Sequence, residues 1–436
     1  MDINKLKNLN AFISLTSAVK TGETEPAGAI TYALADNICT TELKTTCASF
    51  MLKAYQPPFG SSAAQKLKEK GALLVGKTNM DEFGVGAWGK SSYFGAVKNP
   101  WNEKHTAGSG AAAAVAGGAV TLALATDRWG ELRQSAAYCG VMGLKPTYGR
   151  ISRRGLIDCA PSLEQLGIIA RNIADLASAL ETISGNDPQD PTSYKGDVPS
   201  YTDQLQERVR TIKVAVPESW ADAPYMTKEV KEAFANGLGR LNKTCFQVET
   251  VALPHLRQSL ITAVIIGAVE AFSNMANFDG VRFGLRAKGN HLQEMYRLTR
   301  TEGFSSEIKQ FLTFGALISS GNYYNDYFLK AQKMRTIIKK ELDQCLQQYD
   351  LILAPTTPFK APLLGDGDNV NNESLLPDSA ASYTAAANLA GLPAMTFPLP
   401  SPGTDRLPTA ALHFTAKAWD ETLLLQTARL LENEQE

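Results

Sequence analysis

The sequence predicts an α/β fold in which helices flank a mixed or parallel β-sheet. Short apolar runs, with the length of buried strands, alternate along the chain with longer segments whose apolar residues recur at helical spacing. The 436 residues are 44% hydrophobic and 20% charged, which is the composition of a globular protein with a large core. The sequence shows no internal repeat.

The N-terminal part of the chain supplies the first of these elements. We expect a short helix and a turn within the first 30 residues, followed by a buried strand at 29–34, where the sequence reads AITYAL. Residues 61–70 predict a helix. The apolar run at 72–75 predicts a strand that ends at Gly76, because glycine commonly interrupts regular structure.

A run of small residues at 106–126, TAGSGAAAAVAGGAVTLALAT, is the most unusual feature of the sequence. Two interpretations are open. Small side chains allow a helix to pack closely against a sheet or another helix. Alternatively, a glycine-rich turn exposes backbone N–H groups at the start of a helix. The segment is not a P-loop, because the G-K-[ST] ending is absent.

The next segment, 185–210, is rich in Pro, Asp, Gly and Ser. This composition predicts a linker or a long surface crossing. The run KVAV at 213–216 then predicts a strand that Pro217 closes. One face of a helix follows, formed by Val230, Phe234, Leu238 and Leu241.

A second apolar stripe predicts a long helix that ends near Tyr349. We interpret the stripe as part of the core rather than as a cofactor contact. The run LILA at 351–354 predicts a buried strand that Pro355 ends, and residues 363–380 predict a loop. The stripe consists of Tyr327, Ala331, Met334, Ile338, Leu342 and Cys345.

Charge and composition exclude several classes of protein. With 43 Lys+Arg against 44 Asp+Glu, the net charge of −1 gives no electrostatic footprint for nucleic acid. The six cysteines and four histidines lack the short spacings of zinc ligands, so we expect no metal site and buried thiols in a reducing compartment. We expect no membrane span, because no run of about 18 apolar residues occurs. The N-terminal segment lacks the pattern of a secretory signal and is at best a poor mitochondrial presequence.

Several long strings carry a more specific signal than periodicity can give. Four lie in the first half: GKTNMDEFGVG (76–86), SYFGAVKNPW (92–101), RQSAAYCGVMGLKPTYGRISRRGL (133–156) and SLEQLGIIAR (162–171). Four lie in the second half: TRTEGF (299–304), YYNDYFLKAQKMRT (323–336), DLILAPTTP (350–358) and ANLAGLPAMTFPLP (387–400). Together they resemble the amidase signature family, and within it the A subunits of glutamyl-tRNA(Gln) amidotransferases, in a form similar to mitochondrial versions.

The resemblance implies a single amidase-like domain over 1–436, with an α/β amidase-signature fold. Residues 28–186 correspond to the signature core, 187–280 to a weakly matched insertion or crossing, and 281–436 to the C-terminal part of the same sheet. In the family this subunit hydrolyses glutamine and passes ammonia to a B-type subunit, which uses ATP and Mg²⁺ on a misacylated tRNA, while a small third subunit clamps the pair. The resemblance thus implies no cofactor in this chain, contact with tRNA only through the complex, and a place in the mitochondrial matrix or, alternatively, the cytoplasm.

The family's chemistry uses a serine nucleophile, a second serine held by a cis peptide bond, and a lysine. A serine hydroxyl is a weak nucleophile until a base takes its proton, and a buried lysine can act as that base through the second serine. In this chain the lysine position, in AITYALADNI, holds Ala35. The second-serine position, in HTAGSGA, holds Ala107, and the nucleophile position, in ATDRWGELRQS, holds Glu131. All three catalytic positions are therefore replaced.

The substrate-binding positions of the family are replaced as well. Arg128 and Trp129 stand where the family has Thr and Gly in the loop that binds the oxyanion, and a Trp side chain should obstruct that turn. Ala381 stands where the family has the Asp that holds the amino group of glutamine. Five residues around the site match the family: Asp36, Asn37, Asp127, Gly130 and Arg133.

Other residues could in principle replace the lost chemistry. We expect Ser109 and Ser135 to be hydrogen-bonded structural serines, and Lys44 to face solvent. Glu131 could act as a nucleophile or general base, but we expect it to form an ion pair with Arg128 or Arg133. Attack of a carboxylate on an amide would give a high-energy anhydride.

Three interpretations of function follow. The first is a catalytically silent subunit that keeps the fold and binds a B-type partner. The second is a working glutaminase or amidase that uses residues not identified by the resemblance. The third is an inactivated variant, natural or engineered, that acts only as a binding or decoy protein.

Overall fold

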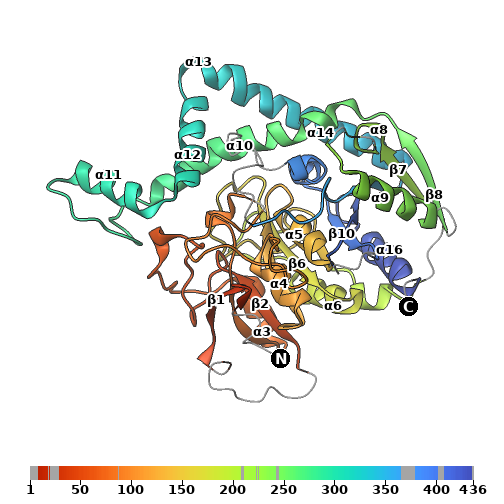
Figure 1. The fold of residues 1–436 in the computed structure, drawn as a ribbon, viewed down its shortest axis with the longest axis horizontal. Coiled ribbons are helices and arrows are strands. Elements are labelled where there is room, and N and C mark those ends of the chain that lie inside the picture. Colours follow the sequence, from red (N-terminus) through yellow and green to blue (C-terminus); the bar gives the residue numbers. More distant parts are fainter. Residues whose placement is uncertain are drawn as a thin grey trace.

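A mixed β-sheet runs through the middle of the computed structural model, with helices on both sides (Figure 1). The residues that the structure describes are 8–17, 19, 29–86, 88–207, 211–221, 223, 225–241, 245–364, 379–400 and 407–434. Within them the sheet has 11 strands in the order β1-β3-β2-β4-β6-β5-β10-β11-β9-β7-β8. The strands are β1 (Phe12–Leu15), β2 (Thr31–Ala35), β3 (Leu73–Thr78), β4 (Leu122–Asp127), β5 (Met142–Lys145), β6 (Gln165–Ala170), β7 (Ile212–Pro217), β8 (Phe246–Val251), β9 (Leu351–Pro355), β10 (Ala394–Pro398) and β11 (Ala411–Ala416).

The sheet is parallel in two places and antiparallel elsewhere. β2 runs parallel to β3 and β4, and β7 runs parallel to β8 and β9. The central strands β4, β6, β5, β10, β11 and β9 pair antiparallel. These pairings confirm the predicted mixed sheet, and the middle of the sheet joins strands from both halves of the sequence.

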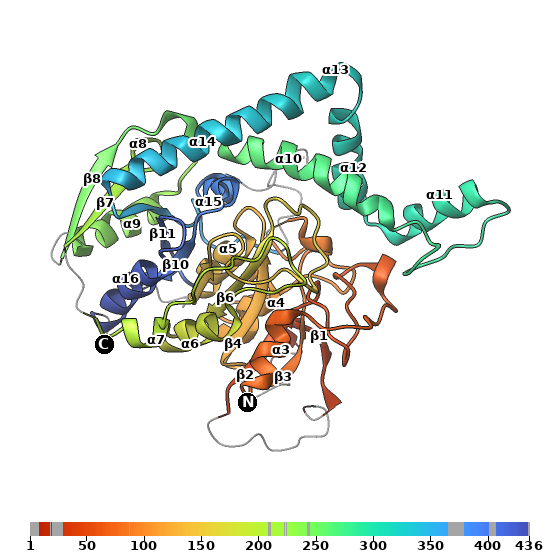
Figure 2. The ribbon, with the colours of Figure 1, turned by 180° about the vertical axis from the view of Figure 1, so that it is seen from behind.

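Helices cover the sheet and extend beyond it. α10, α12, α13 and α14 form a long layer along one side, and α11 reaches away from the body of the molecule in both views (Figures 1 and 2). The α-helices are α3 (Ser62–Glu69), α4 (Gly110–Ala116), α5 (Glu131–Cys139), α6 (Ile173–Ile183), α7 (Tyr201–Gln204), α8 (Glu218–Ala221), α9 (Lys228–Leu241), α10 (Ser259–Asn274), α11 (Leu292–Gly303), α12 (Ser306–Ile318), α13 (Gly321–Tyr323), α14 (Leu329–Gln348), α15 (Ala385–Ala390) and α16 (Glu421–Asn433). Short 3₁₀ turns are η1 (Phe50–Leu52), η2 (Glu82–Gly84), η3 (Pro254–Gln258), η4 (Met275–Asn277) and η6 (Ser379–Ser382), and η5 (Tyr324–Phe328) is a π-helix.

The run of small residues forms α4 and the strand β4 that follows it. The hydroxyl of Ser109 caps the helix by accepting the N–H of Ala112 (3.2 Å). A Cβ atom placed on Gly110 would lie 2.1 Å from the carbonyl oxygen of Ala11 and 2.7 Å from the backbone nitrogen of Asn79. Close packing of the helix against neighbouring backbone is therefore the interpretation that the structure supports.

Most of the predicted elements are present. The strands predicted at 29–34, 213–216 and 351–354 are β2, β7 and β9, and the helix predicted at 61–70 is α3. The segment 185–210 crosses the surface as turns and the short helix α7, as far as residue 207. The helical face at 230–241 belongs to α9, in which Val230, Phe234 and Leu241 are buried. The loop predicted at 363–380 lies largely outside the described residues.

Three details of local structure differ from expectation, and each difference has a physical reason. The described residues 8–10 are helix and turn, as expected, but residues 12–15 form the unexpected strand β1, because they pair antiparallel with β3 from far along the chain. Gly76 does not end β3: a Cβ there would lie 2.3 Å from the carbonyl oxygen of Ser14, so glycine lets β1 come close. Tyr327 is 49% exposed, because the π-helix shifts the helical register before the buried stripe of α14 begins.

The helical segment Pro254–Asn277 is apolar and long enough to cross a membrane, with a mean hydropathy of 1.5. Half of its most apolar 18-residue stretch is buried within the fold, where α10 packs against α12 and α14. This is the environment of a core helix and is consistent with the expectation of no membrane span. The six cysteines are unpaired, and five of them are buried.

The close approach at Gly110 gives a stability test. The Gly110→Ala substitution places a methyl group against backbone atoms that cannot move aside, and we expect it to lower the free energy of unfolding by about 1–3 kcal/mol. Gly239→Ala in α9 is the matched control, because nothing lies within 4 Å of its Cβ position, and it should raise the stability by about 0.5–1 kcal/mol. Urea unfolding measures both, and equal effects of the two substitutions would contradict the packing at α4.

Candidate active site

The positions for which the resemblance predicts replaced catalytic residues lie near one edge of the sheet. The parallel strands β2, β3 and β4 end side by side there, with Ala35 paired to Thr78 in the β2–β3 register. α5 begins just after β4, at Glu131. Ala35, Ser109, Thr126 and Glu131 line a cavity of about 30 Å³ between these elements. This volume holds about one water molecule.

Ala107, at the second-serine position, lies immediately before α4 and is fully buried. Its backbone N–H donates to the carbonyl oxygen of Val97 (3.1 Å), and its own carbonyl oxygen accepts the thiol of Cys139 (3.5 Å). Its neighbour Gly108 lines the cavity. The residues that the structure describes contain no cis peptide bond. Ala35 and Glu131 thus line the cavity, and Ala107 lies next in the chain to a residue that lines it.

The carboxylate of Glu131 folds back over the start of its own helix. Its Oε2 atom accepts the backbone N–H groups of Arg128 (2.8 Å), Trp129 (3.0 Å) and Gly130 (3.2 Å). An acidic side chain in the first turn of a helix is favoured by the unpaired N–H groups and by the helix dipole. The N–H groups of the loop before α5 therefore point at an oxygen atom that the chain itself supplies.

Arg128 supplies the positive charge beside this carboxylate. Its Nη2 atom donates to Glu131 Oε1 (3.1 Å) and to the carbonyl oxygen of Gly84. Burial alone would lower the pKa of the Arg128 guanidinium, but the carboxylates of Glu131 and Glu164 outweigh it and raise that pKa. Of the two ion pairs expected for Glu131, the structure confirms the one with Arg128.

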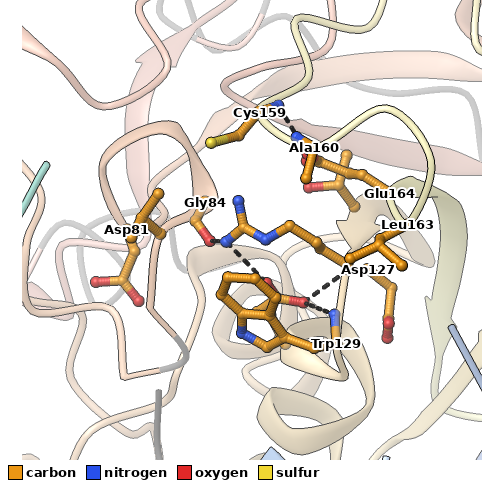
Figure 3. A network of polar contacts seen from close by, with 12 residues as sticks. Asp81, Gly84, Asp127, Trp129, Cys159, Ala160, Leu163 and Glu164 are labelled. Carbon is orange, nitrogen blue, oxygen red and sulfur yellow. Dashed lines mark hydrogen bonds and ion pairs between the residues drawn. The ribbon is translucent and has the colours of Figure 1, made fainter. Parts of the chain in front are cut away.

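Trp129 fills the space next to the loop. The ring of Trp129 (Figure 3) is fully buried. Its centroid lies 3.8 Å from the Arg128 guanidinium, and the ring meets Phe311 edge-on at 6.1 Å. A Cβ on Gly267 would lie 2.9 Å from the indole, so α10 approaches closely only because glycine stands there. Ala381 belongs to the same cluster of buried apolar side chains. Arg128 and Trp129 thus pack into the interior beside the reduced cavity.

The retained Asp127 and Arg133 form a buried ion pair that ties the site to distant strands. Arg133 Nε and Nη2 donate to the two carboxylate oxygens of Asp127 (2.9 and 2.8 Å), and Nη1 donates to the carbonyl oxygen of Thr384 (3.1 Å) and to Nε2 of His413 (2.7 Å). Burial opposes ionisation of Asp127, but the charge and hydrogen bonds of Arg133 hold its pKa below the usual value. Burial lowers the pKa of His413 well below its usual value, in keeping with a neutral ring that accepts from Arg133.

The remaining retained residues are also structural. Asp36 Oδ2 accepts the backbone N–H groups of Thr46 (3.0 Å) and Ala48 (3.1 Å), which fixes the loop after β2. Asn37 Nδ2 donates to Thr126 Oγ1 (3.2 Å). Gly130 has φ of 128°, and a Cβ there would lie 1.9 Å from the hydroxyl oxygen of Thr384. Only glycine can therefore occupy this position in the loop.

The candidate substitutes behave as expected from the sequence. Ser109 Oγ donates to Ser135 Oγ (3.0 Å), and Ser135 Oγ donates to the carbonyl oxygen of Leu132 (3.0 Å), so both hydroxyls serve local structure. Lys44 is exposed. Among the described residues, those that line the cavity include neither a lysine nor a histidine.

Three buried charged residues near the site were not singled out from the sequence. Lys77 lies on β3 next to Thr78, and its ammonium donates to Thr45 Oγ1 (3.0 Å) rather than into the cavity. Burial lowers the pKa of Lys145 to about 7, but its ammonium donates to the carbonyl oxygens of Pro146 (3.1 Å) and Leu392 (2.5 Å). Glu164 is labelled in Figure 3. Burial raises the pKa of Glu164 to about 7, although the charge of Arg128 acts to lower it. Each lies inside a string quoted above, which is the only sequence signal for them.

Comparison with known proteins gives a consistent result. The amidase family model matches residues 9–425. The chain is 40% identical over 407 residues to the A subunit of the glutamyl-tRNA(Gln) amidotransferase from Halothermothrix orenii, covering 92% of this chain and 84% of that protein. It is 40% identical over 401 residues to the A subunit of the same enzyme from Halalkalibacterium halodurans, covering 91% and 81%.

Solved structures agree with the sequence relatives. The crystal structure of the A subunit of the glutamyl-tRNA(Gln) amidotransferase from Thermotoga maritima has a TM-score of 0.80 at 33% identity, covering 98% of this chain and 88% of that one. The 6-aminohexanoate cyclic dimer hydrolase shares the fold, with a TM-score of 0.84 at 21% identity, covering 99% and 92%.

The Arg128–Glu131 pair gives a test by double-mutant cycle. Glu131→Ala leaves three N–H groups and a buried guanidinium without their acceptor, and we expect a loss of about 3–5 kcal/mol of unfolding free energy. Arg128→Met in the Glu131→Ala background should cost less than in the wild-type background, by at least about 1 kcal/mol. The exposed pair Lys98–Glu103 is the control, with an expected coupling of about 0–1 kcal/mol. Additive effects at residues 128 and 131 would contradict the pairing.

Glu164 gives a test by pH. Its pKa of about 7 in the folded chain lies above the value of about 4.3 expected when unfolded, so the folded chain keeps a proton that the unfolded chain loses. The resulting stability is complete below pH about 4.3 and is lost as the pH rises through about 7. Between pH about 5 and 7, wild-type stability should therefore fall more steeply than that of Glu164→Gln, by up to ~1.4 kcal/mol per pH unit. Urea unfolding across this range measures the difference, with Glu103→Gln as the exposed control that should follow the wild type. Parallel pH dependences of stability for the wild type and Glu164→Gln would refute the prediction.

Proposed function

The chain belongs to the amidase family, and from that premise we propose that it is an A-type subunit of a glutamyl-tRNA(Gln) amidotransferase whose own hydrolytic site is silent. The scaffold supports the first part of the proposal, since similarity to known A subunits extends over 92% of the chain. The observation that carries the second part is the Glu131 carboxylate, which occupies the N–H groups of the loop before α5.

The chemistry of amide hydrolysis explains why these replacements matter together. A hydroxyl nucleophile needs a base that removes its proton, and here alanine stands at both the base and relay positions while a carboxylate stands at the nucleophile position. Removal of one member of such a triad typically lowers the catalytic rate by a factor of about 10³ or more, and the effects of the members are not independent. Loss of all three therefore leaves no route to an acyl intermediate.

Stabilisation of the transition state is blocked by the same side chain. An oxyanion forms its strongest contacts with N–H groups that are free and already oriented. The N–H groups of Arg128, Trp129 and Gly130 are instead saturated by Glu131 Oε2 at 2.8–3.2 Å. A substrate carbonyl would have to displace an ion-paired carboxylate from a cavity of about 30 Å³. Geometry and chemistry thus support the same proposal.

The partners belong to the proposal as well. We place two further subunits beside this chain, one of B type and one small third subunit, with ATP, Mg²⁺ and tRNA handled by the complex. The net charge of −1 agrees with a protein that does not itself hold nucleic acid. The mitochondrial matrix is the location that we propose, with the cytoplasm as the alternative.

Reconstitution tests the proposal. The chain is co-expressed with the B-type and third subunits, and the complex is supplied with Glu-tRNA(Gln), ATP and Mg²⁺. We expect the chain to co-purify, and amidation to proceed with ammonium chloride but to stay at background with glutamine, at least about 10³-fold below a complex that carries an A subunit with the intact triad. Glutamine-dependent amidation would contradict the silent site, and failure to co-purify would contradict the place in the complex.

A further inference from the structure

A second, larger cleft lies between the chain after η2 and the end of α11. Its volume is about 450 Å³, within the range of small-molecule sites, and it shares no lining residue with the cavity beside Glu131. Phe50 and Tyr93 form one wall, Glu302 and Phe304 the other, and Glu82 the interior. We call it the Glu82 cleft.

The Glu82 carboxylate is buried without a cation. The residue is 2% exposed, and its oxygens accept the hydroxyl of Ser49 (2.5 Å) and the N–H of Ser305 (3.1 Å). It forms no ion pair within the described part of the chain. Burial raises the pKa of the Glu82 carboxyl, the hydrogen bonds from Ser305 and Ser49 lower it, and the carboxylate of Glu307 raises it further. A buried carboxylate is costly unless a positive charge compensates it. Two hydrogen bonds leave lone pairs on the carboxylate for a further donor.

The lining adds to the negative charge. Glu302, at the end of α11, is exposed on the opposite side of the cleft, and the nine lining residues include these two carboxylates and no lysine or arginine among the described residues. The cleft therefore presents two carboxyl groups to a ligand, and a cation bound beside the buried one would favour its charged form.

A lysine of the chain already lies over the two rings of the aromatic wall. The rings of Phe50 and Tyr93 lie 5.2 Å apart, and the Nζ atom of Lys53 sits 5.3 and 5.1 Å from their centroids. The same ammonium donates to the Tyr93 hydroxyl (3.1 Å). Ring faces arranged in this way attract cations. The wall thus shows, with a side chain of the protein itself, the kind of group that it accepts.

We propose that the Glu82 cleft is a binding site for a primary alkylammonium group, which places its charge between Glu82 and Glu302 and its alkyl chain against Phe50, Tyr93 and Phe304. The ligand is either a free amine or a lysine side chain of a partner, since both present the same group. This site is independent of the proposed amidotransferase role.

Ligand-observed NMR titration of the full chain tests the site. Butylammonium chloride is the probe for a free amine, Nα-acetyl-lysine-N-methylamide is the probe for a lysine side chain, and 1-butanol is the neutral control of equal length. We expect saturable binding of butylammonium, or of both amines, and at least about tenfold weaker binding of butanol. If only butylammonium saturates the site, the ligand is a free amine. If Nα-acetyl-lysine-N-methylamide saturates it as well, the site also accepts the lysine side chain of a partner.

Variants locate the binding. Glu82→Gln should weaken the amine about tenfold, and Glu302→Gln and Tyr93→Leu, which alter exposed side chains and leave the core intact, about threefold each. Lys53→Met removes the resident ammonium and should strengthen binding about threefold. Glu103→Gln, an exposed carboxylate outside the cleft, is the matched control. Equal binding of butanol, or affinities that none of the cleft variants changes, would overturn the proposal.

Discussion

The three hydrogen bonds from residues 128–130 to the carboxylate of Glu131 determine the rest of the site. Through these bonds, the backbone N–H groups of the loop before α5 bind a carboxylate of the same chain. A buried carboxylate requires a cation, and Arg128 supplies it. The guanidinium in turn stacks on Trp129, whose ring packs against α10 and α12. These contacts together leave only the small cavity beside Glu131.

The framework persists because other residues hold it. Asp127, Arg133, Asn388 and Thr384 link β4 and α5 to α15 through buried hydrogen bonds, and none of these bonds involves Ala35, Ala107 or Glu131. Asp36 and Gly130 fix the two loops beside the cavity through backbone contacts. The framework around the cavity is therefore held by contacts that do not involve the residues at positions 35, 107 and 131.

The sequence predicts the parts of this structure that depend on local patterns. The apolar runs of β2, β7 and β9 and the stripe of α14 are recognisable because burial of a strand or a helix face leaves a periodic signal. β1 and the continuation of β3 through Gly76 depend on pairing between residues about 60 positions apart, which no local pattern records. At the site, the replacements that the resemblance implies stay a prediction, whereas the ion pair of Glu131 with Arg128, expected from charge, is confirmed. The N–H groups that Glu131 accepts could not be predicted, because they depend on the direction of one side chain at the start of a helix.

The central claim is that no group of this chain can attack a glutamine side chain and that the N–H groups meant for its oxyanion are already taken. The most direct measurement is intact mass spectrometry of the purified chain after incubation with a glutamine analogue that carries a diazoketone, which alkylates the nucleophile of glutamine hydrolases. An A subunit with the intact triad, treated in parallel, should gain the mass of one adduct. The account predicts an unchanged mass for this chain; a single stoichiometric adduct on a residue that lines the cavity beside Glu131 would contradict it.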